Sequence, residues 1–540
     1  MEALPADLAD FSGRQDAVRT GVRVLCERSP HAPAILGVSG PAGVGKTSFA
    51  VHLAHVTRRT YPSGRILIRL DVDADNSPRT VLTSCLRALD VPAASIPAEL
   101  PEQARLLQSH LRQAPFLIVV DGVTHEAQVR PLLDLETRCG VILTSRRRLD
   151  GLDSIGHLEL SPMSEQESVE LIRRTVGPDR TDAMPAHTAT LVRYCEGLPL
   201  ALRICAARLT ARPAWTVGDL VARLAAERSR LDWLKTGDRA VRSSFDTTYR
   251  QIDELDRRLF RRLGVLNMPT FPAWVAGALL GVDHELGERV LDALGDVRLV
   301  EPAGRGTTGP RYQMHNLLRI FARERAARED GARDTDAALG RALDGWLALV
   351  QEVDTVSSGK YVMDPEPAPA WRPPPHVFDE VRADPVAWRE TEQPCLVAAV
   401  RLAAERDMPQ SAWPLAQRSS TYYDTVNQLE GWQSTLRTAL DACQRAGDAA
   451  GTACMLRHLA EAHSVGGRLD EAHETARAAQ RIYARRDHRW GTAVLGPRIA
   501  FIHREQGRSA RARVCAEDAV RAARAAQEPV ALARALTCLA

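Results

Sequence analysis

Lysine is nearly absent from this 540-residue sequence, which contains three lysines although lysine and arginine together number 70. The strong preference for arginine suggests a coding bias, so arginine counts alone carry little weight. Long hydrophobic runs are absent too. The longest strongly apolar stretch, Phe116–Val120, is far too short to cross a bilayer, and no cationic-apolar signal segment follows Met1. These absences argue against a membrane protein and favour a cytoplasmic location.

Paired cysteines and an excess of one charge are also absent. Ten cysteines are scattered singly, without a C-x-x-C pair or a His/Cys cluster at metal-ligand spacing. We therefore expect reduced thiols that act as small core residues. The net charge of +2 neither favours nor excludes a nucleic-acid partner. The length predicts three or more domains.

One of the three lysines, Lys46, lies in the octapeptide Gly-Pro-Ala-Gly-Val-Gly-Lys-Thr, which is a complete G-x-x-x-x-G-K-T phosphate loop. In such a loop backbone N–H groups surround the phosphates, the lysine reaches the β- and γ-phosphates, and the threonine hydroxyl ligates Mg²⁺. An apolar stretch at Ala34–Val38 leads into the loop and a helical pattern leaves it, so a helix N-terminus points at the anion. We predict that the nucleotide is bound by Gly40, Pro41, Ala42, Gly43, Val44, Gly45, Lys46, Thr47 and Ser48.

Three further apolar stretches, Arg65–Leu70, Phe116–Val120 and Val141–Thr144, alternate with helical segments and predict a parallel sheet covered on both faces. The second ends at Asp121, whose carboxylate can hold the Mg²⁺ shell beside the loop; the alternative is a core strand with an incidental acid. Arg146 follows the third, where it senses a γ-phosphate or belongs to a solvated basic turn. We expect catalytic roles for Lys46, Asp121 and Arg146, and metal-binding roles for Thr47 and Asp121.

The remaining sequence is mostly helical in pattern. Three amphipathic segments followed by two strand-like segments around a glycine-rich turn predict a winged helix. A proline-rich stretch, Asp364–Pro375, is expected to be an exposed loop. The fold class is thus an α/β P-loop NTPase domain followed by helical, winged-helix and α-solenoid domains. The predicted divisions are an N-terminal lead (1–34), the P-loop domain (35–160), a helical domain (161–235), the winged helix (236–326), a helical linker (327–410) and repeats (411–540).

The C-terminal part repeats with a constant offset. Gly451-Thr452-Ala453 recurs as Gly491-Thr492-Ala493, and Gly467-Arg468 recurs as Gly507-Arg508. Small residues at fixed positions allow paired helices to stack closely. Tetratricopeptide-like repeats are favoured, although the offset exceeds their usual unit of about 34 residues, and a HEAT-like array is the alternative. The sequence stops inside a repeat, so we expect the natural protein to extend further.

Together these features resemble the NB-ARC branch of the STAND nucleotide-binding switches, especially actinobacterial antibiotic regulators with C-terminal tetratricopeptide arrays. The resemblance covers roughly residues 4–325 and implies ATP/ADP and Mg²⁺ as cofactors. It also indicates that the effector domain which often precedes the switch is lacking. Six motifs occur in the family's order: Phe11-Ser12-Gly13-Arg14, the phosphate loop, the strand ending at Asp121, Thr144-Ser145-Arg146, Gly197-Leu198-Pro199-Leu200-Ala201 and Met314-His315-Asn316.

The resemblance implies roles for residues outside the phosphate loop. Phe11, Gly13 and Arg14 would lie near the adenine, and Pro199 would pack against the base. His315 would reach the β-phosphate of bound ADP from the winged helix and hold the domains closed. Without the family, Pro199 is interpreted as a helix kink and His315 as a histidine at a strand end.

Two residues depart from the family's pattern. Gly122 stands where many members have a second acid after the Walker B aspartate, which predicts slow hydrolysis that an acid at this position would accelerate. Asn316 replaces the aspartate of the Met-His-Asp motif, which puts the tightness of the ADP-bound state in doubt.

The function expected from these features is an ADP/ATP-dependent signalling switch, at most a slow ATPase, that acts as a transcriptional or signal-transduction regulator. The repeats would sense a protein or small-molecule ligand, and a nucleotide-dependent homo-oligomer is a further expectation. One alternative is a winged-helix DNA-binding transcription factor, but acidic residues outnumber Arg289 and Arg298 in and just after the third helix, so direct DNA contact is disfavoured. The other is a working ATPase such as a remodelling motor, which Gly122 disfavours.

Overall fold

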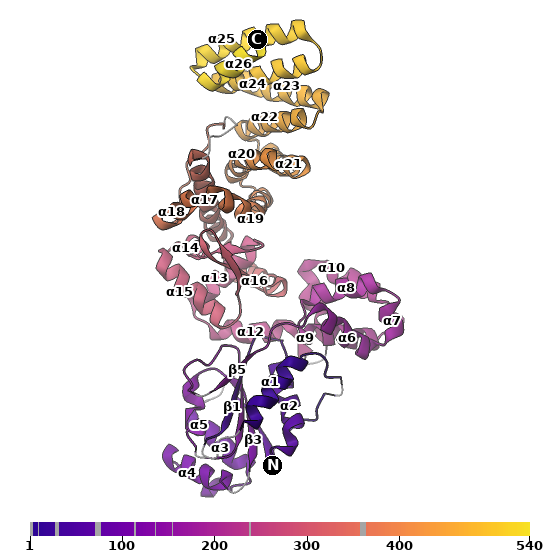
Figure 1. The fold of residues 1–540 in the computed structure, drawn as a ribbon, viewed down its shortest axis with the longest axis vertical. Helices are drawn as coiled ribbons and strands as arrows, with labels where there is room; N and C mark the ends of the chain where they lie inside the picture. The colour runs from indigo at the N-terminus through magenta and orange to yellow at the C-terminus, as the bar shows by residue number, and fades with distance from the viewer. Residues whose placement is uncertain are drawn as a thin grey trace. The chain divides into compact units, whose positions relative to one another are not determined.

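A computed structural model describes most of the chain, which divides into two compact units (Figure 1). The first comprises Met1–Phe260, Asp292–Glu301 and Met314–Glu324, and the second comprises Arg261–Leu291, Pro302–Gln313 and Arg325–Ala540. We describe the two units in turn. The described residues are 4–8, 10–27, 32–70, 77–112, 115–135, 137–153, 155–236, 239–356 and 363–540.

The first unit is built on a parallel five-stranded sheet with the order β2-β3-β4-β1-β5. Its strands are β1 (Ala34–Ser39), β2 (Gly64–Arg69), β3 (Phe116–Val123), β4 (Gly140–Ser145) and β5 (Gly156–Glu159). The four strands expected from the sequence are confirmed, whereas β5 was not predicted. All strands point the same way, so the residues that follow β1, β3 and β4 gather at one edge of the sheet.

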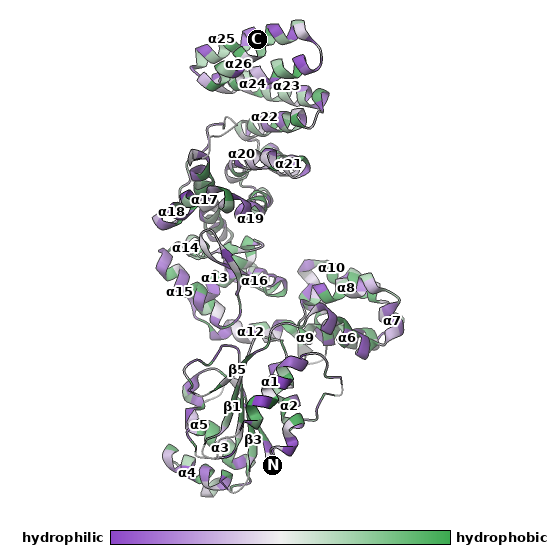
Figure 2. Ribbon diagram, viewed as in Figure 1, coloured by the Kyte–Doolittle hydropathy of each residue, from purple (hydrophilic) through white to green (hydrophobic). Residues whose placement is uncertain are grey.

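Helices cover both faces of this sheet, and the strands β1 and β3 are mainly hydrophobic (Figure 2). Side chains alternate between two cores along β3. Leu117 and Val119 pack with the helix α2, whereas Ile118 and Val120 pack with the helices on the other face. The helices are α1 (Gln15–Cys26) and α2 (Lys46–Val56) on one face, and α3 (Pro78–Ala88), α4 (Leu100–Leu111) and α5 (Arg130–Leu133) on the other. This two-sided burial is the α/β architecture predicted from the alternating pattern.

A run of short helices follows the sheet. They are α6 (Glu165–Val176), α7 (Pro178–Asp182), α8 (Pro185–Cys195), α9 (Pro199–Thr210), α10 (Val217–Ala225) and α11 (Arg230–Trp233). Ser164 and Glu167 form a capping box that starts α6, because the Ser164 hydroxyl accepts from the Glu167 N–H and the Glu167 carboxylate accepts from the Ser164 N–H. Pro199 begins α9, and at this position the backbone N–H that a proline lacks would have no acceptor within the helix. It is therefore a helix start rather than a kink.

The next segment contains helices and then a small antiparallel sheet. The helices are α12 (Val241–Gln251), α13 (Glu254–Leu266), α14 (Trp274–Leu280) and α15 (His284–Asp296), and the sheet has the order β8-β10-β9, from Phe271–Pro272, Gly309–Gln313 and Glu301–Gly306. The three amphipathic segments expected from the sequence correspond to α13, α14 and α15, and two strands follow them, but α12 and β8 were not among the predicted elements. The winged helix stays a prediction. The two compact units divide the segment between them. The six-part division of the chain stays a prediction.

The second unit is dominated by helices that repeat with the predicted period. Helices α20, α22, α24 and α26 begin at Pro409, Ala449, Arg489 and Pro529, which are evenly spaced along the sequence. The helix α16 (Asn316–Glu329) is divided between the two units at Arg325. The helices that follow it are α17 (Ala332–Val356), α18 (Pro375–Ala383), α19 (Pro385–Glu405), α20 (Pro409–Thr425), α21 (Leu429–Arg445), α22 (Ala449–Val465), α23 (Leu469–Arg485), α24 (Arg489–Glu505), α25 (Ser509–Ala526) and α26 (Pro529–Leu539).

The repeated glycines allow close packing of these helices. A Cβ atom at Gly451 would lie 2.5 Å from the Trp413 ring, and one at Gly491 would lie 2.4 Å from the Tyr483 ring. Any side chain at either position would therefore push the neighbouring helix away. None of the helices in the described ranges combines the length and the apolarity that crossing a bilayer requires.

The proline-rich stretch differs from its predicted exposed loop. Residues 363–374 are neither helix nor strand, as expected, but Asp364 is only 6% exposed. Its carboxylate binds Arg457 and Tyr483, which come from the helices α22 and α23. Composition alone suggested a solvated segment because these partners lie far along the sequence, 93 and 119 positions beyond Asp364.

Candidate nucleotide-binding site

The phosphate loop runs from the end of β1 to the start of α2 in a conformation that requires glycine. Gly40 has a φ of 151° and lies so close to the chain that a Cβ atom would approach the Leu160 carbonyl oxygen to 2.4 Å. Gly45, the residue before α2, has a left-handed φ of 89°, and no side chain caps the helix there. The first N–H groups of α2 are thus open to an anion.

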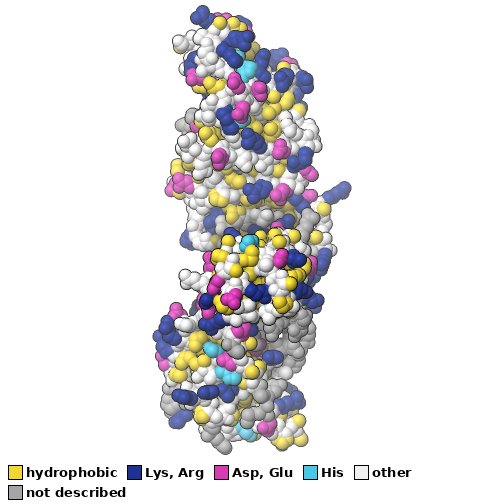
Figure 3. All heavy atoms as spheres, turned by 90° about the vertical axis from the view of Figure 1, so that its right-hand side faces the viewer, with side chains coloured by type: hydrophobic (Ala, Val, Ile, Leu, Met, Phe, Trp, Pro, Cys, Tyr) yellow, Lys and Arg dark blue, Asp and Glu magenta, His cyan; other side chains and the backbone are white. Residues whose placement is uncertain are grey.

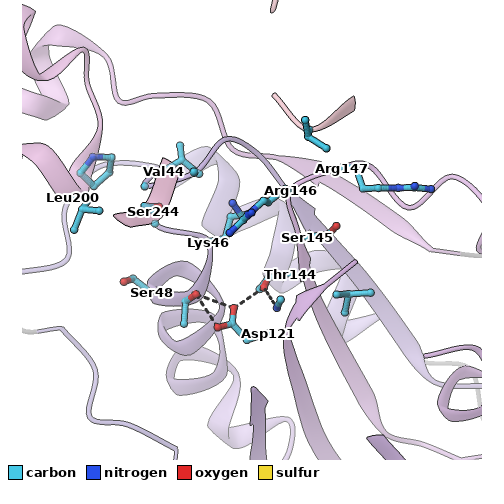
Figure 4. Close-up of a pocket in the computed structure, with 18 of the residues that line it drawn as sticks. Val44, Lys46, Ser48, Asp121, Thr144, Ser145, Arg146, Arg147, Leu200 and Ser244 are labelled. Atoms are coloured by element: carbon cyan, nitrogen blue, oxygen red, sulfur yellow. Dashed lines mark hydrogen bonds between the residues drawn. The ribbon is translucent and has the colours of Figure 1, made fainter. Parts of the chain in front are cut away.

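Lys46 points into a cavity where the neighbouring charges are mainly positive (Figure 4). Its ammonium donates to the carbonyl oxygens of Gly40 and Pro41, at 2.7 and 2.9 Å. Burial lowers the pKa of Lys46 to about 7; the nearby Arg146 lowers it as well, Asp121 opposes this, and Arg14 adds to the lowering. A polyphosphate at this place would supply the missing negative charge.

Asp121 lies at the end of β3, opposite the start of α2. Its carboxylate accepts hydrogen bonds from the hydroxyl of Thr47, at 2.8 and 2.9 Å, and from the hydroxyl of Thr144 (Figure 4). The Thr144 hydroxyl also accepts from the Gly122 N–H at 3.0 Å. A carboxylate and a hydroxyl on adjacent elements form an oxygen donor set that suits Mg²⁺. These residues fit a metal-nucleotide complex.

Gly122 lies in a bulge of β3, and its backbone shows why it carries no acid. The register with β4 shifts between Asp121 and Val123, and Gly122 has a φ of 90°. A Cβ atom there would lie 3.2 Å from the Leu70 carbonyl oxygen. The expectation that an acid at this position would accelerate hydrolysis stays a prediction, and the strain that such a side chain would place on the strand holding Asp121 opposes it.

Arg146 follows β4 and lines the same cavity, which has a volume of about 930 Å³. Its guanidinium donates to the Gln251 side chain at 2.8 Å, and burial lowers its pKa to about 10. The predicted site residues that line this cavity are Phe11, Arg14, Ala42, Gly43, Val44, Gly45, Lys46, Thr47, Ser48, Asp121, Arg146 and Pro199. Gly13, Gly40, Pro41 and His315 do not line it.

Arg14 connects the segment from Phe11 to Arg14 to the phosphate loop by a hydrogen bond. The Arg14 guanidinium donates to the carbonyl oxygens of Val44, at 2.9 Å, and Ser161, at 3.0 Å. The Arg14 N–H donates to the Glu167 carboxylate at 2.6 Å. Burial alone would raise the pKa of Glu167, but the N–H donors of Arg14 and Ser164 keep it below the usual value. Phe11 stacks on His52 with ring centroids 3.8 Å apart.

Glu167 was missed by sequence reasoning, although its capping-box position after Ser164 could have drawn attention to it. Three more acids line the far side of the cavity and were also missed: Asp253, Asp256 and Asp296. They belong to the winged-helix segment, as do the lining residues Ser244 and Gln251. No motif marks them, because their place at the cavity depends on the tertiary fold.

His315 lies beside the cavity rather than in it. Its Nε2 atom is 2.8 Å from the Glu301 carboxylate, and its Nδ1 atom is 4.0 Å from that of Glu196. The hydrogen bond with Glu301 raises the pKa of His315, burial opposes this, and Glu196 adds to the increase. His315 borders a small neighbouring pocket together with the loop residues Pro41 and Ala42. Its contact with a phosphate stays a prediction.

Glu196 was another residue that the sequence did not reveal. Its carboxylate accepts from the backbone N–H groups of Asn316, at 2.7 Å, and Leu317, at 3.1 Å, and so caps the start of α16. Burial raises the pKa of Glu196, and the N–H donors of Leu317 and Asn316 oppose this, as does His315. The Asn316 side chain instead accepts from Arg319 at 2.6 Å.

A phosphate loop on a parallel sheet, with a Walker B aspartate beside it, defines the class of P-loop NTPases. Residues 14–182 match the NB-ARC domain, so the chain contains an NB-ARC domain of this class. Such domains bind ATP or ADP.

Two curated relatives extend the similarity over most of the chain. It is 35% identical over 480 residues to the regulatory protein AfsR of Streptomyces griseus, which covers 88% of this chain and 49% of that protein. It is also 35% identical over 492 residues to AfsR of Streptomyces coelicolor, with 89% and 49% covered. The chain spans about half the length of these relatives. The similarity supports the resemblance to NB-ARC regulators found in the motifs.

A solved structure of a STAND protein with a tetratricopeptide repeat sensor, from Pyrococcus horikoshii, aligns with 99% of this chain and 80% of its own. The sequence identity is 14% and the TM-score is 0.29. A likeness this weak carries no argument about function.

Proposed function

We propose that this chain is the nucleotide-dependent switch of a transcriptional or signal-transduction regulator, with its repeats as the sensing part. The observation that carries the proposal is the composition of the cavity wall. It combines the phosphate loop with Arg14, Pro199 and residues from 244 to 256 and 293 to 297. A nucleotide there touches segments far apart in sequence, so replacing ADP by ATP changes contacts with several of them at once.

The size of the effect is physically reasonable. Shifting a two-state conformational equilibrium from 1:99 to 99:1 requires a ligand that binds one state more tightly than the other by about 5.5 kcal/mol. Charge-assisted hydrogen bonds contribute about 1.5–3 kcal/mol each, so two or three bonds to a γ-phosphate are sufficient. We propose that Lys46 and Arg146 make them.

Mg²⁺ belongs to the proposal as the second cofactor. Thr47 and Asp121 would hold it, and it would neutralise charge between the phosphates. Nucleotide binding itself needs only the loop, Lys46, Thr47 and Asp121, so the affinity does not depend on a catalytic base. Gly122 supplies no carboxylate that could accept a proton from water, so we propose at most a slow ATPase.

The partners and the location follow from the same reasoning. We propose a protein or small-molecule ligand at the repeats and a nucleotide-dependent homo-oligomer as the signalling form. A cytoplasmic location fits the ten free thiols, most of which are buried.

The alternatives are less well supported. The helix α15 and the residues around it carry Asp283, Glu285, Glu288, Asp292 and Asp296, which would repel DNA phosphates. Among the described residues on the face drawn in Figure 3, basic and acidic side chains are mixed. A working motor needs a positioned base, which the bulge at Gly122 does not provide.

The nucleotide content of purified protein tests the proposal. We expect the wild-type chain to retain ADP near one molecule per chain, and Lys46→Ala to retain less than a tenth of that, because the phosphates lose their main buried cation. Lys235→Ala, which changes an exposed lysine, is the matched control. ADP kept by Lys46→Ala at wild-type stoichiometry would contradict the assignment of this site.

A further inference from the structure

Residues 363–369 lie along the repeat helices as an extended acidic strip. The strip reads Met-Asp-Pro-Glu-Pro-Ala-Pro, and it forms neither helix nor strand. Burial alternates along it: Asp364 and Glu366 are turned inward, whereas Pro365 and Pro367 are exposed. Three prolines restrict the backbone to an extended form at little entropic cost. The strip thus has the form of a bound peptide ligand.

Asp364 contributes the most buried contacts of the strip. Its Oδ2 atom accepts from Arg457 Nε at 2.8 Å and also from an Nη atom of the same guanidinium, which makes the pair bidentate. Its Oδ1 atom accepts from the Tyr483 hydroxyl at 2.6 Å. Both partners are buried, with Arg457 7% and Tyr483 3% exposed. Each oxygen of the carboxylate is therefore matched by a donor from the repeats.

Gln417 contacts the backbone of the strip as well as one of its acids, because its Nε2 atom also donates to the Glu366 carboxylate. Its Oε1 atom accepts from the Asp364 N–H at 3.0 Å, and its Nε2 atom donates to the Asp364 carbonyl oxygen at 3.2 Å. This pair reproduces the hydrogen bonds that a neighbouring strand would make. Any extended peptide could be held in this way, whatever its side chains.

Glu366 supplies the second acidic contact. Its carboxylate accepts from Arg418 Nε and Nη2, at 3.0 and 2.7 Å, and from the Gln351 amide at 2.6 Å. Gln417 and Arg457 occupy the same position in successive repeats, because each is the ninth residue of its helix, α20 or α22. The repeat period therefore places the donors in a row on one side of the array.

The atoms of Asp364, Cys454 and His458 that could ligate a metal lie within 4.8 Å of one another, but they do not indicate a cation. The Arg457 guanidinium bonds to Asp364 and lies 2.8 Å from His458 Nε2, so a positive charge is already present. We assign the cluster to peptide recognition and not to a metal.

We propose that Gln417, Arg418, Arg457 and Tyr483, which we call the acidic-peptide site, bind an extended acidic peptide of a partner protein, and that residues 363–369 fill the site as an internal competitor. The proposal rests on the sensing role proposed for the repeats and specifies its ligand. The partner peptide carries two carboxylates two residues apart, as in Asp-Pro-Glu. Displacing the strip would exchange an internal acid for an external one, so the buried Arg457 would keep a carboxylate partner, while Arg418 would also keep its ion pair with Asp354.

Tethering sets the affinity that a partner needs. A short tether gives the strip an effective concentration on the order of 1 mM. If the strip itself has an intrinsic Kd of about 10 µM, a free peptide would bind the wild-type chain roughly 100-fold more weakly than a chain whose strip has lost its acids. The strip therefore raises the apparent Kd of every competing peptide, and only a peptide with a lower intrinsic Kd than the strip binds the wild-type chain well.

The test uses the full chain and a fluorescein-labelled peptide, Met-Asp-Pro-Glu-Pro-Ala-Pro, with fluorescence anisotropy as the readout. We expect the double variant Asp364→Ala/Glu366→Ala to bind this peptide at least tenfold more tightly than the wild type. A peptide with Asn and Gln in place of the two acids should bind neither protein. Nucleic acid is a separate ligand, and an oligonucleotide that competed as well as the acidic peptide would contradict the proposal.

A second variant identifies the surface. In the double variant, Tyr483→Phe should weaken peptide binding about tenfold, because it removes one donor to the carboxylate and preserves the ring. Tyr422→Phe, which changes a tyrosine of α20, should leave binding unchanged. The proposal is overturned if the double variant retains its helical circular dichroism but binds the acidic peptide no better than the wild type.

Failure of this test is distinguishable from failure of the proposed nucleotide switch. Peptide binding is measured directly at the repeats, and Lys46→Ala should leave it unchanged. Conversely, ADP content reports on the phosphate loop alone. A protein that keeps ADP and ignores the peptide would refute only the peptide site.

Discussion

Lys46 is a cation whose nearest charged neighbours include two more cations. Its pKa of about 7 results first from burial and then from Arg146, with a further contribution from Arg14, and Asp121 only partly offsets them. A bound phosphate reverses this balance, because an adjacent anion favours the ammonium form. Nucleotide binding and protonation of Lys46 therefore support each other.

Gly122 shows how a single backbone angle limits the chemistry of this site. Its φ of 90° is a left-handed conformation that costs a non-glycine residue about 1–2 kcal/mol. A side chain there would also press on the Leu70 carbonyl oxygen. Replacing Gly122 by an acid would therefore also require the backbone of the bulged strand to change.

We expect Gly122→Ala to lower thermal stability and to weaken ADP binding severalfold, because relief of the strain moves Asp121. Gly122→Asp should likewise fail to raise the rate of ATP hydrolysis. Gly309→Ala is the matched control, since Gly309 also has a φ of 90° but nothing lies within 4 Å of its Cβ position. Differential scanning fluorimetry with and without ADP measures the effect. Equal losses in the two alanine variants would show that the Leu70 contact is unimportant.

At the scale of elements, the start of α16 depends on a residue from another segment. Glu196 has a left-handed φ of 53° at the end of α8, and from there its carboxylate accepts from the first N–H groups of α16. The partial positive charge of a helix N-terminus favours such an anion. His315, immediately before α16, is held between Glu196 and Glu301. The Glu196 carboxylate thus connects the motif Gly197–Ala201, which it immediately precedes, to the motif Met314–Asn316.

Glu196→Ala should destabilise the first turn of α16. Two partly buried N–H groups lose their acceptor, which costs about 1–3 kcal/mol, so the amides of Asn316 and Leu317 should exchange hydrogen about tenfold faster or more. Glu165→Ala, an exposed acid in the first turn of α6, is the control. Hydrogen–deuterium exchange with mass spectrometry of peptides covering residues 314–320 gives the readout. Unchanged protection of these amides would mean that Glu196 does not cap the helix.

The elements also show what sequence alone can predict. The strands β1 to β4 carry uninterrupted apolar runs and were predicted, whereas β5 has four residues with His157 and Glu159 among them and carries too little pattern. The phosphate loop was found because its contacts are local. Glu196 and Asp364 were missed or misjudged because their partners are distant in sequence. Local pattern reveals an element, but not which distant side chain completes it.

At the scale of the whole molecule, the two compact units separate the candidate functions. All residues that line the nucleotide cavity lie between Leu8 and Val297 and belong to the first unit. The repeats and the acidic-peptide site belong to the second. Repeat helices stabilise mainly their own neighbours, so removing some of them should not disturb a core they do not share.

Ending the chain at Val426 should therefore leave ADP binding within about threefold of the wild-type affinity, because no cavity residue is lost. The same truncation removes Arg457 and Tyr483, so it should abolish binding of the acidic peptide even when Asp364 and Glu366 are replaced. Isothermal titration of ADP and anisotropy of the labelled peptide measure the two effects on one preparation. Size-exclusion chromatography guards against aggregation through the newly exposed face of α20. The truncated chain with Lys46→Ala is the control for specific nucleotide binding. If the folded, monodisperse truncation lost ADP, the repeats would be part of the nucleotide domain's core and the division into switch and sensor would be wrong.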